Sequence, residues 1–452
     1  SRQTQAGNEA ATEAKDVLSG AAALIQNASD QVGRTRRDAV KAAMAHAWKG
    51  YKRYAYGKDE LRPISKSGRN NWGRTATTLV DSLSTLWLMG MKEEFYQARD
   101  WVRDRLDHDK SGKVSVFEAT IRNLGGLLSA YDLSGDEAFL AKADDLGGRL
   151  LNAFGSPSGV PYTQVDLRTG EARNRPQIPK STLLAECGTL QVEFRYLARV
   201  TGKDEYARKA ERVHEILAGM QPESGLMPVH IENTQDDAKF GKGSVISFGS
   251  LGDSAYEYLL KVWLQGGKLE SERIYRDMYD RAIQGLHDEL LLRSDESGLT
   301  FVTELHDGAV KKKMDHLVCF LGGTLALGAY TDPRGLSSDR AQRDLRTGKA
   351  LAYTCFQMYA RTKTGIAPES VWFDSDGDLE LDEKADFYLL RPEAVETFYI
   401  LHQLTGDPMY REWGWSIFQS IEKYCKTEAA YSGLHRVDSD ALPEDRMESF
   451  FL

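Results

Sequence analysis

The 452-residue sequence predicts an all-α fold made of repeated helical hairpins. Three observations support this prediction. From Arg36 onward, apolar residues recur at three- and four-residue spacing, as in the segment 40–57, which is typical of amphipathic helices. Turns rich in Gly and Asp precede further amphipathic segments near residues 133, 200 and 404. Glycine turns also recur with a period of about 67 residues, which is the length of two helices and their connections.

The elements follow one another in a regular order along the chain. Residues 1–35 are rich in Ala, Gln, Asp and Ser, so we expect a stem or leader that is weakly ordered or helical. Residues 36–452 are expected to form one domain of six or seven hairpins. Short β segments beside the repeated glycines predict small β-hairpins and loops at one end of it. These glycines are Gly159, Gly225, Gly298, Gly365 and Gly433.

The number of hairpins is high enough for the chain to close into a ring, with one helix of each pair on the inside. An open solenoid is the rival geometry, because periodicity alone does not distinguish the two.

Composition narrows the classes of function. The net charge of -9 disfavours binding to nucleic acid, because a mildly acidic protein repels phosphate backbones. No segment has the roughly 18 consecutive apolar residues of a membrane span. The four cysteines form no CxxC pair, so a zinc site is not expected, although one structural disulfide is possible. Nucleotide-binding glycine motifs and a GxSxG nucleophile elbow are also missing from the sequence.

Acidic residues recur at matched positions of the repeats. Glu186, Asp253 and Glu393 each lie 27 or 28 residues after a glycine of the series, and each precedes an apolar helical segment. Glu118 fits the same place in an earlier repeat. If the repeats are equivalent, these acids begin successive inner helices, and closing the ring brings them together at one end of the axis.

Further polar residues accompany the four acids. Glu393 and Glu396, as well as Glu118 and Arg122, have the spacing of neighbours on one helix face. Glu186 and Glu193 are seven residues apart, which predicts that they share a helix face two turns apart. With these acids, we expect a polar pocket inside the apolar ring that also contains Arg122, His316 and Arg391.

Simpler interpretations exist for each residue taken alone. A Glu in the first turn of a helix is usually a cap or a partner of the helix dipole, and a lone His is more often a satisfied core residue. Four acids at matched positions nevertheless favour a shared site. A cavity lined by carboxylates predicts glycoside hydrolysis, which uses one acid on the leaving oxygen and one carboxylate on water or carbon.

The chain resembles the class I alpha-1,2-mannosidases, which are inverting, calcium-dependent enzymes that trim high-mannose N-glycans in the secretory pathway. The matching stretches lie in the order found in the family and span residues 40–452. They are AWKGYKRYAYGKDELRPIS, TLVDSLSTLWLMGM, VSVFEATIRNLGGLLSAY, LGDSAYEYLLK, MDHLVCFLGG, YLLRPEAVETFYIL and MESFFL. The resemblance implies an (α/α)7 barrel, in agreement with the repeat count.

The resemblance also implies roles for individual residues. Glu118 would be the general acid, acting through a water, Asp253 a second acid near the scissile bond, and Glu393 the base for the attacking water. Phe450 would stack on the sugar. The other positions that line the sugar pocket of the family correspond here to Arg122, Glu186, Glu193, Leu251, His316, Arg391 and Glu396.

The family resemblance also predicts which cysteines are bonded. Cys319 and Cys355 match the family's disulfide, which suits an oxidising lumen, and Cys187 and Cys425 are expected to be free thiols in the core.

Leu251 bears on the substrate range and the compartment. In the family, an arginine at this position accompanies removal of a single mannose, whereas Leu251 resembles the broader Golgi-type members. We therefore expect a protein of the secretory pathway lumen, in the Golgi rather than the endoplasmic reticulum. The domain itself is not expected to be embedded in a membrane, and a native membrane anchor would lie outside these residues. We also expect a monomer.

The cofactor implied by the resemblance is Ca²⁺. In the family, a last inner helix with a further Glu and a calcium-binding Thr follow the stretch SFFL, and here they would lie after Leu452. We therefore expect no metal ligand within this sequence, and expect the last inner helix and the C-terminal calcium-binding segment to be lacking from it.

The resemblance predicts an exo-glycosidase that removes terminal alpha-1,2-linked mannose from the high-mannose N-glycans of glycoproteins. A mannose-binding, lectin-like member of the family that acts in glycoprotein quality control with little hydrolysis is the alternative, because the same pocket would serve both. A different sugar enzyme with an α/α toroid, such as an epimerase, is a third and weaker interpretation.

Overall fold

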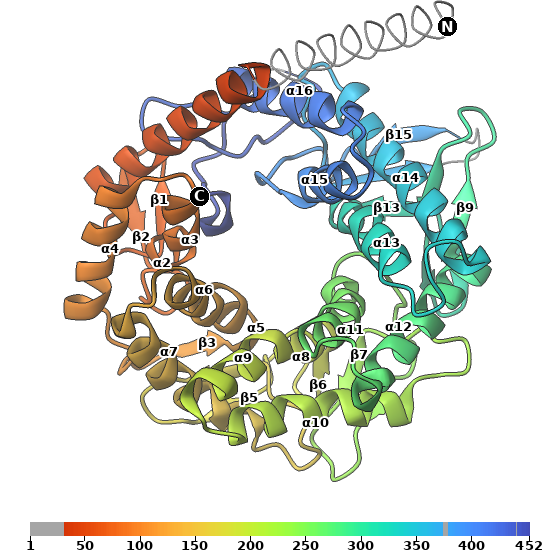
Figure 1. The fold of residues 1–452 in the computed structure, drawn as a ribbon, viewed down its shortest axis with the longest axis horizontal. Helices are drawn as coiled ribbons and strands as arrows, with labels where there is room; N and C mark the ends of the chain where they lie inside the picture. Colours follow the sequence, from red (N-terminus) through yellow and green to blue (C-terminus); the bar gives the residue numbers. More distant parts are fainter. Residues whose placement is uncertain (1–30, 374–377, 440) are drawn as a thin grey trace, which may run out of the picture.

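The computed structural model describes residues 31–373, 378–439 and 441–452. Its helices form two concentric layers around a central axis, and the first and last helices of the outer layer lie side by side (Figure 1). Arg36 of helix 31–54 donates hydrogen bonds to both carboxylate oxygens of Glu412 on the last outer helix. The hairpins therefore close into a ring, and the open solenoid is excluded.

The outer layer contains the longer amphipathic helices. In chain order these are helix 31–54, α4 (Lys92–Arg105), α7 (Glu137–Leu150), α10 (Glu205–Met220), α12 (Arg273–Gly285), α14 (Asp339–Ala360) and α16 (Met409–Tyr424).

The inner layer alternates with the outer one along the chain. Its segments are α2 (Thr77–Asp81) with α3 (Leu83–Leu88), α5 (Val116–Glu118) with η1 (Ala119–Leu124) and α6 (Gly125–Ser134), α8 (Leu184–Gly188) with α9 (Gln191–Thr201), α11 (Asp253–Gln265), η5 (His316–Phe320) with α13 (Leu321–Tyr330), and α15 (Glu393–Thr405). Successive inner segments contact one another around the ring. This arrangement confirms the predicted barrel of helical hairpins.

Three inner helices end in the same way. Gly135, Gly202 and Gly406 follow α6, α9 and α15 with φ near +70°, a conformation that costs glycine little. Each glycine N–H donates to the carbonyl four residues earlier, which caps the helix and turns the chain outward. These are the Gly-Asp and Gly-Lys-Asp turns that the sequence predicted between inner and outer helices.

The glycine turns that recur about every 67 residues have the expected turn conformation at four of the five positions. Gly159, Gly225, Gly298 and Gly365 all have φ between +65° and +81°. Gly433 differs, because its backbone lies outside the left-handed region. A Cβ atom there would lie 2.6 Å from the carbonyl oxygen of Tyr388, so close packing of two backbones requires that glycine.

Small antiparallel sheets connect the outer helices to the inner ones, as predicted. Three of them are three-stranded, and the first strand of each leads into an inner segment: β3 into α5, β6 into α8 and β13 into η5. Because the inner helices all begin at this end of the barrel, the ends of these strands surround its axis.

The strands of these sheets are short. They are β1 (Glu60–Arg62) with β2 (Ser67–Arg69), β3 (Lys113–Ser115) with β4 (Gln164–Asp166) and β5 (Ala172–Arg173), β6 (Ser181–Leu183) with β7 (His230–Glu232) and β8 (Lys239–Phe240), β9 (Leu291–Arg293) with β10 (Thr300–Val302), β11 (Glu304–His306) with β12 (Ala309–Lys311), and β13 (Lys313–Asp315) with β14 (Ser370–Phe373) and β15 (Leu379–Leu381). The remaining helical turns are η2 (Leu151–Phe154), η3 (Glu270–Glu272), η4 (Leu286–Leu290) and η6 (Ser449–Phe451).

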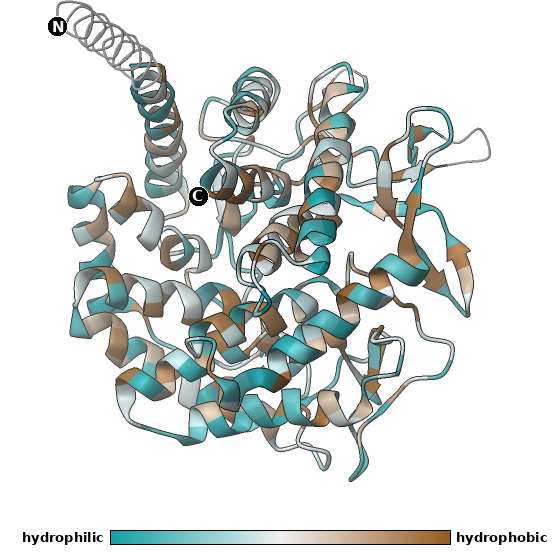
Figure 2. Cartoon of the chain, turned by 45° about the vertical axis from the view of Figure 1, so that its right-hand side comes forward, coloured by the Kyte–Doolittle hydropathy of each residue, from teal (hydrophilic) through white to brown (hydrophobic). Residues whose placement is uncertain are grey.

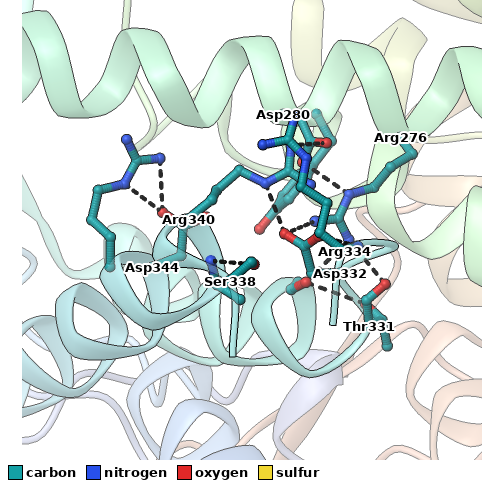
Figure 3. A network of polar contacts seen from close by, with 12 residues as sticks. Arg276, Asp280, Thr331, Asp332, Arg334, Ser338, Arg340 and Asp344 are labelled. Carbon is teal, nitrogen blue, oxygen red and sulfur yellow. Dashed lines mark hydrogen bonds and ion pairs between the residues drawn. The ribbon is translucent and has the colours of Figure 1, made fainter. Parts of the chain in front are cut away.

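A buried ion network fixes α12 against the turn between α13 and α14 (Figure 3). Arg276 is fully buried, and it donates to Asp280 at 2.8 Å and to the carbonyl of Gly328 at 3.0 Å. Arg340 joins the same network by donating to Asp332 at 2.7 Å and to Asp280 at 2.5 Å. A buried guanidinium needs such partners, so this network determines how the two hairpins pack.

The disulfide predicted from the resemblance is present. Cys319 in η5 is bonded to Cys355 in α14, and Cys187 and Cys425 are buried free thiols, as expected. The bond ties an inner segment to its outer partner, so it reinforces one wall of the barrel.

Only the last residues of the expected N-terminal stem lie within the described part of the chain. The expected stem, residues 1–35, falls mainly on residues 1–30, which lie outside the described part, while residues 31–35 belong to helix 31–54. The helices in Figure 2 carry hydrophilic as well as hydrophobic residues along their length, and no described helix is long and apolar enough to cross a membrane.

Candidate active site

A cavity of about 490 Å³ lies where the inner segments begin. Its walls come from α5, η1, α8, α11, η5, α15 and η6, which are elements from all around the ring. The cavity is therefore on the barrel axis, and residues far apart in the sequence face one another across it.

The four acids of the repeats converge on this cavity, as predicted. Glu118 follows strand β3 in a short helix whose N-cap is Ser115, and Glu186 lies in the first turn of α8, directly after β6. Asp253 and Glu393 are the first residues of α11 and α15. All four line the cavity, which supports a shared site over four unrelated helix caps.

Arg122 connects Glu118 to the aromatic wall of the cavity. Its Nε donates to Oε2 of Glu118 at 2.7 Å, and its Nη1 lies 3.9 Å from Asp81. The guanidinium lies between two rings, 5.7 Å from the centroid of Trp72 and 5.0 Å from that of Phe450. Burial lowers the pKa of Arg122, but the two carboxylates more than offset it, so the net shift is upward.

A π-helical turn follows Glu118 directly. The segment Ala119–Leu124 (η1) separates α5 from α6 and contains Arg122. Such turns are rare and occur often at functional sites, because the extra residue in the turn redirects side chains. Here Glu118 and Arg122 still meet at i, i+4 across the start of the turn.

Arg391 is held at the cavity by an acid that the sequence analysis did not identify. Glu369 accepts two hydrogen bonds from the guanidinium, with Nε to Oε2 at 2.5 Å. Such a bidentate pair fixes both position and orientation. Burial lowers the pKa of Arg391, but the paired Glu369 raises it above its usual value overall, so this arginine is a permanent cation beside Glu393.

Three of the cavity's carboxyl groups hold protons unusually tightly. Burial raises the pKa of Glu186 to about 7, although Arg175 opposes the shift. Burial likewise raises the pKa of Asp253 to about 7, against hydrogen bonds from Ser254. The pKa of Glu396 rises to about 7 through burial and the negative charge of Glu257. Groups of this kind can donate a proton near neutral pH.

Most of the other predicted residues also line the cavity. Besides the four acids, they are Arg122, Leu251, Arg391, Glu396 and Phe450. Leu251 is 41% exposed and has a φ of +76°, a conformation that is uncommon for a residue with a side chain. Its strained backbone presents an apolar side chain at the cavity wall.

Glu193 and His316 do not line the cavity. The prediction that Glu193 shares a helix face with Glu186 is wrong, because α8 ends at Gly188 and α9 begins at Gln191. Glu193 is instead buried beside α11, where it accepts a hydrogen bond from Tyr258 at 2.7 Å. Burial raises its pKa to about 7.

His316 lies behind the cavity wall rather than in it. It is fully buried at the start of η5, which follows strand β13 just as α5 follows β3. Its Nδ1 is 3.4 Å from Oε2 of Glu393. His316 therefore contacts the site through Glu393.

The structure adds residues that the sequence reasoning missed. Arg175 reaches Glu186 from the loop before β6, and no local pattern marked it. Glu257 lines the cavity one turn after Asp253, so the i, i+4 spacing could have identified it. Lys261 pairs with Glu257 and lies 3.9 Å from Glu396.

The described residues supply suitable donor atoms for a hard cation but no complete site for one. Carboxylate oxygens are ligands that Ca²⁺ prefers, and Oε2 of Glu186 and of Glu393 is buried without a hydrogen-bond partner. Within residues 31–373, 378–439 and 441–452, however, no three His, Cys, Asp or Glu side chains are grouped so that they could hold a metal ion. No chemical step is therefore assigned to a metal.

Comparisons with a family model and with known proteins all indicate the same enzyme family. The model of glycosyl hydrolase family 47 matches residues 43–452. Over 424 residues the chain is 43% identical to mannosyl-oligosaccharide 1,2-alpha-mannosidase MNS1 of Arabidopsis thaliana, which covers 94% of this chain and 74% of that protein. Over 426 residues it is 43% identical to the endoplasmic reticulum mannosyl-oligosaccharide 1,2-alpha-mannosidase of Rattus norvegicus, covering 92% of this chain and 63% of that relative.

A solved structure shares the whole architecture. The alpha-1,2-mannosidase from Trichoderma reesei superposes with a TM-score of 0.84 at 29% sequence identity. The match covers 92% of this chain and 91% of that chain. The ring of hairpins therefore belongs to an architecture that is already known.

Proposed function

The chain belongs to glycosyl hydrolase family 47, and on that premise we propose that it removes terminal alpha-1,2-linked mannose from high-mannose N-glycans with inversion of configuration. The observation that carries the proposal is the convergence of Glu118, Asp253 and Glu393 on one axial cavity. Glycoside hydrolysis needs separate carboxyl groups on the two sides of the scissile bond, and this cavity supplies them from three inner segments.

In the proposed mechanism Glu393 is the base. One of its oxygens, Oε2, is buried without a hydrogen-bond partner, and the permanent cation Arg391 lies beside it. Glu393 takes a proton from a water, whose oxygen attacks the anomeric carbon from the face opposite the leaving group.

Glu118 is the proposed acid and acts through a water. The hydrogen bond from Arg122 occupies Oε2 of Glu118, and in this proposal a water between Glu118 and the leaving oxygen relays the proton of the acid. Asp253 is placed as a second acid, and its pKa of about 7 keeps a proton available near neutral pH.

The terminal mannose is proposed to bind among the remaining lining residues. Phe450 offers an aromatic face to the apolar C–H surface of the sugar, and Arg391 and Glu396 offer polar groups to its hydroxyls. Leu251 sets the space available beside the next sugar. It is the residue on which we base the proposal of a broad, Golgi-type substrate range and location.

Ca²⁺ is part of the proposal as the cofactor, on the strength of the family resemblance and of the carboxylate-rich cavity. When bound, it would supply contacts to sugar hydroxyls and water. We further propose that the protein acts as a monomer in the lumen of the secretory pathway.

Release of mannose tests this function and separates it from the lectin alternative. Purified protein is incubated with a high-mannose N-glycan, with and without a chelator, and free mannose is measured. We expect release that falls on chelation and returns with Ca²⁺. Binding of the glycan without release would support the lectin-like function instead.

Two variants make the test specific to the site. Glu393→Gln is expected to lower kcat by about 100-fold or more while sparing glycan binding, since it removes the base but keeps the shape of the side chain. Glu171→Gln changes an exposed acid that does not line the cavity and serves as the matched control. Normal turnover of Glu393→Gln would refute the assignment of the base.

A further inference from the structure

We propose that Tyr359 is a positioning residue for the reaction: its buried hydroxyl, supported by Tyr388, holds Nε2 of His316 and so fixes the imidazole that presents Nδ1 to Glu393. This inference rests on the proposed function, because it assigns a support to the proposed base. None of the three supporting residues lines the cavity.

The chain of contacts is continuous from the outer layer to the cavity wall. The Tyr359 hydroxyl, from α14, lies 2.7 Å from Nε2 of His316, and the two rings meet edge to face with centroids 5.5 Å apart. On the other side of the imidazole, Nδ1 faces Oε2 of Glu393 at 3.4 Å. Neither of these last two atoms has another hydrogen-bond partner, so each is the other's available partner.

That distance of 3.4 Å is longer than an ordinary hydrogen bond. Hydrogen bonds between catalytic groups are often long before the substrate is bound and tighten in the complex. The orientation of the imidazole is already set, because Tyr359 holds its far nitrogen and both rings are buried.

Tyr388 supports Tyr359 on the side away from His316. A hydrogen bond joins the two hydroxyls. The Tyr388 hydroxyl also donates to the carbonyl of Arg391 at 3.4 Å. Burial raises the pKa of both tyrosines far above the usual range, so both hydroxyls keep their protons.

The tautomer of His316 follows from the partners of its two nitrogens. The carboxylate of Glu393, as the proposed base, can only accept a hydrogen bond, whereas the hydroxyl of Tyr359 can donate or accept. A neutral imidazole has one donor and one acceptor nitrogen, so both contacts are satisfied when Nδ1 carries the proton and Tyr359 donates to Nε2. In the other tautomer, a lone pair on Nδ1 would face the carboxylate of Glu393.

The consequence for Glu393 is a fixed carboxylate. An N–H at Nδ1 holds Oε2 and leaves Oε1 to accept a proton from the attacking water. The other titratable or charged groups that act on Glu393 from neighbouring elements are Asp253, Tyr359, Tyr388, Arg391 and Glu396. None of these makes the hydrogen bond that the imidazole can make.

The substitution Tyr359→Phe tests the inference with little change in packing. Without the hydroxyl, both tautomers become accessible, and we expect kcat for mannose release to fall about 10- to 100-fold, less than the roughly 10²- to 10⁴-fold that general acid–base catalysis contributes in full, because the base itself is still present. KM should change less than about twofold, because Tyr359 touches no substrate. Tyr279→Phe is the matched control: both tyrosines are 1% exposed, and the hydroxyl of Tyr279 donates to the backbone carbonyl of Thr324 at 3.3 Å.

A second background shows whether Tyr359 acts through the imidazole. In His316→Asn, the side-chain amide can still donate toward Glu393 but does not extend to Tyr359. Adding Tyr359→Phe to His316→Asn should therefore change kcat little, whereas a purely structural effect would be the same in both backgrounds. Thermal unfolding of every variant identifies any that has lost the fold.

The outcomes separate this inference from the proposed function. If the unsubstituted protein releases no mannose, the proposed function fails. If it releases mannose and Tyr359→Phe turns over at the same rate, or loses kcat equally in both backgrounds, the positioning role of Tyr359 is overturned while the proposed function stands.

Discussion

Replacing Glu193 by Gln should stabilise the protein at alkaline pH but not at acidic pH. Glu193 is buried behind the cavity, with its Oε1 accepting from Tyr258 and its Oε2 lacking a hydrogen-bond partner. Burial raises its pKa from 4.5 to about 7. Gln has nearly the same shape, can accept from Tyr258 in the same way, and has no charge at any pH.

The sign and size of the effect follow from linkage between protonation and folding. The native carboxyl binds its proton more tightly than the unfolded one, so its contribution to stability is fully present below pH 4.5 and is lost as the pH rises through 7. Between pH 5 and pH 8, a shift of this size changes the free energy of unfolding by about 2 to 3 kcal/mol. Other buried acids titrate in both proteins, so they cancel in the difference.

Urea unfolding of both proteins at pH 5 and pH 8 measures this difference. The variant should gain about 2 to 3 kcal/mol relative to the unsubstituted protein on going from pH 5 to pH 8. Glu205→Gln, at an exposed position of α10, is the control and should show no such gain. An equal pH dependence for Glu193→Gln and the unsubstituted protein would refute the argument that Glu193 is ionised at a cost in the native state.

Two further predictions concern the cavity wall and the disulfide. Phe450→Ala should raise KM about 2- to 10-fold, because the sugar loses an aromatic face against which it packs. Initial rates measure this change. A change in kcat with an unchanged KM would contradict a role for Phe450 in sugar binding. Replacing Cys319 and Cys355 together by Ala removes a covalent link between residues 36 apart and should lower the free energy of unfolding by about 4 kcal/mol. Denaturant titration with and without reductant measures this change. An unchanged unfolding midpoint would contradict a stabilising role for the disulfide.

The general architecture could be predicted from the sequence because the repeats are regular. Gly135, Gly202 and Gly406 end three inner helices with the same backbone conformation, and the surrounding apolar spacing identifies helices on either side. The four acids could be predicted for the same reason. Each begins an inner segment, so equivalence of the repeats was enough to bring them together.

The local details depend on tertiary contacts that periodicity does not encode. Glu193 was misplaced because Thr189 and Leu190 interrupt the helix between it and Glu186, although neither residue is a strong helix breaker. Gly433 was predicted as a turn glycine, but glycine is required there because a Cβ atom would lie too close to the carbonyl oxygen of Tyr388. Arg175 and Glu369 reach the site from loops, where spacing carries no information about direction.

The support behind Glu393 was equally inaccessible to sequence reasoning. His316 was identified as a candidate, but its partners Tyr359 and Tyr388 lie on other elements and outside the cavity. Buried tyrosines are by default core residues, and only the geometry distinguishes these two from Tyr256 or Tyr279.

The anomeric form of the first mannose released tests the central claim most directly. Proton NMR of the reaction in its first minutes distinguishes α- from β-mannose before the two equilibrate. Attack by a water that Glu393 activates, on the face opposite the leaving group, predicts that β-mannose is released first from an alpha-1,2 linkage. Initial release of α-mannose would contradict the arrangement of acid and base across the cavity.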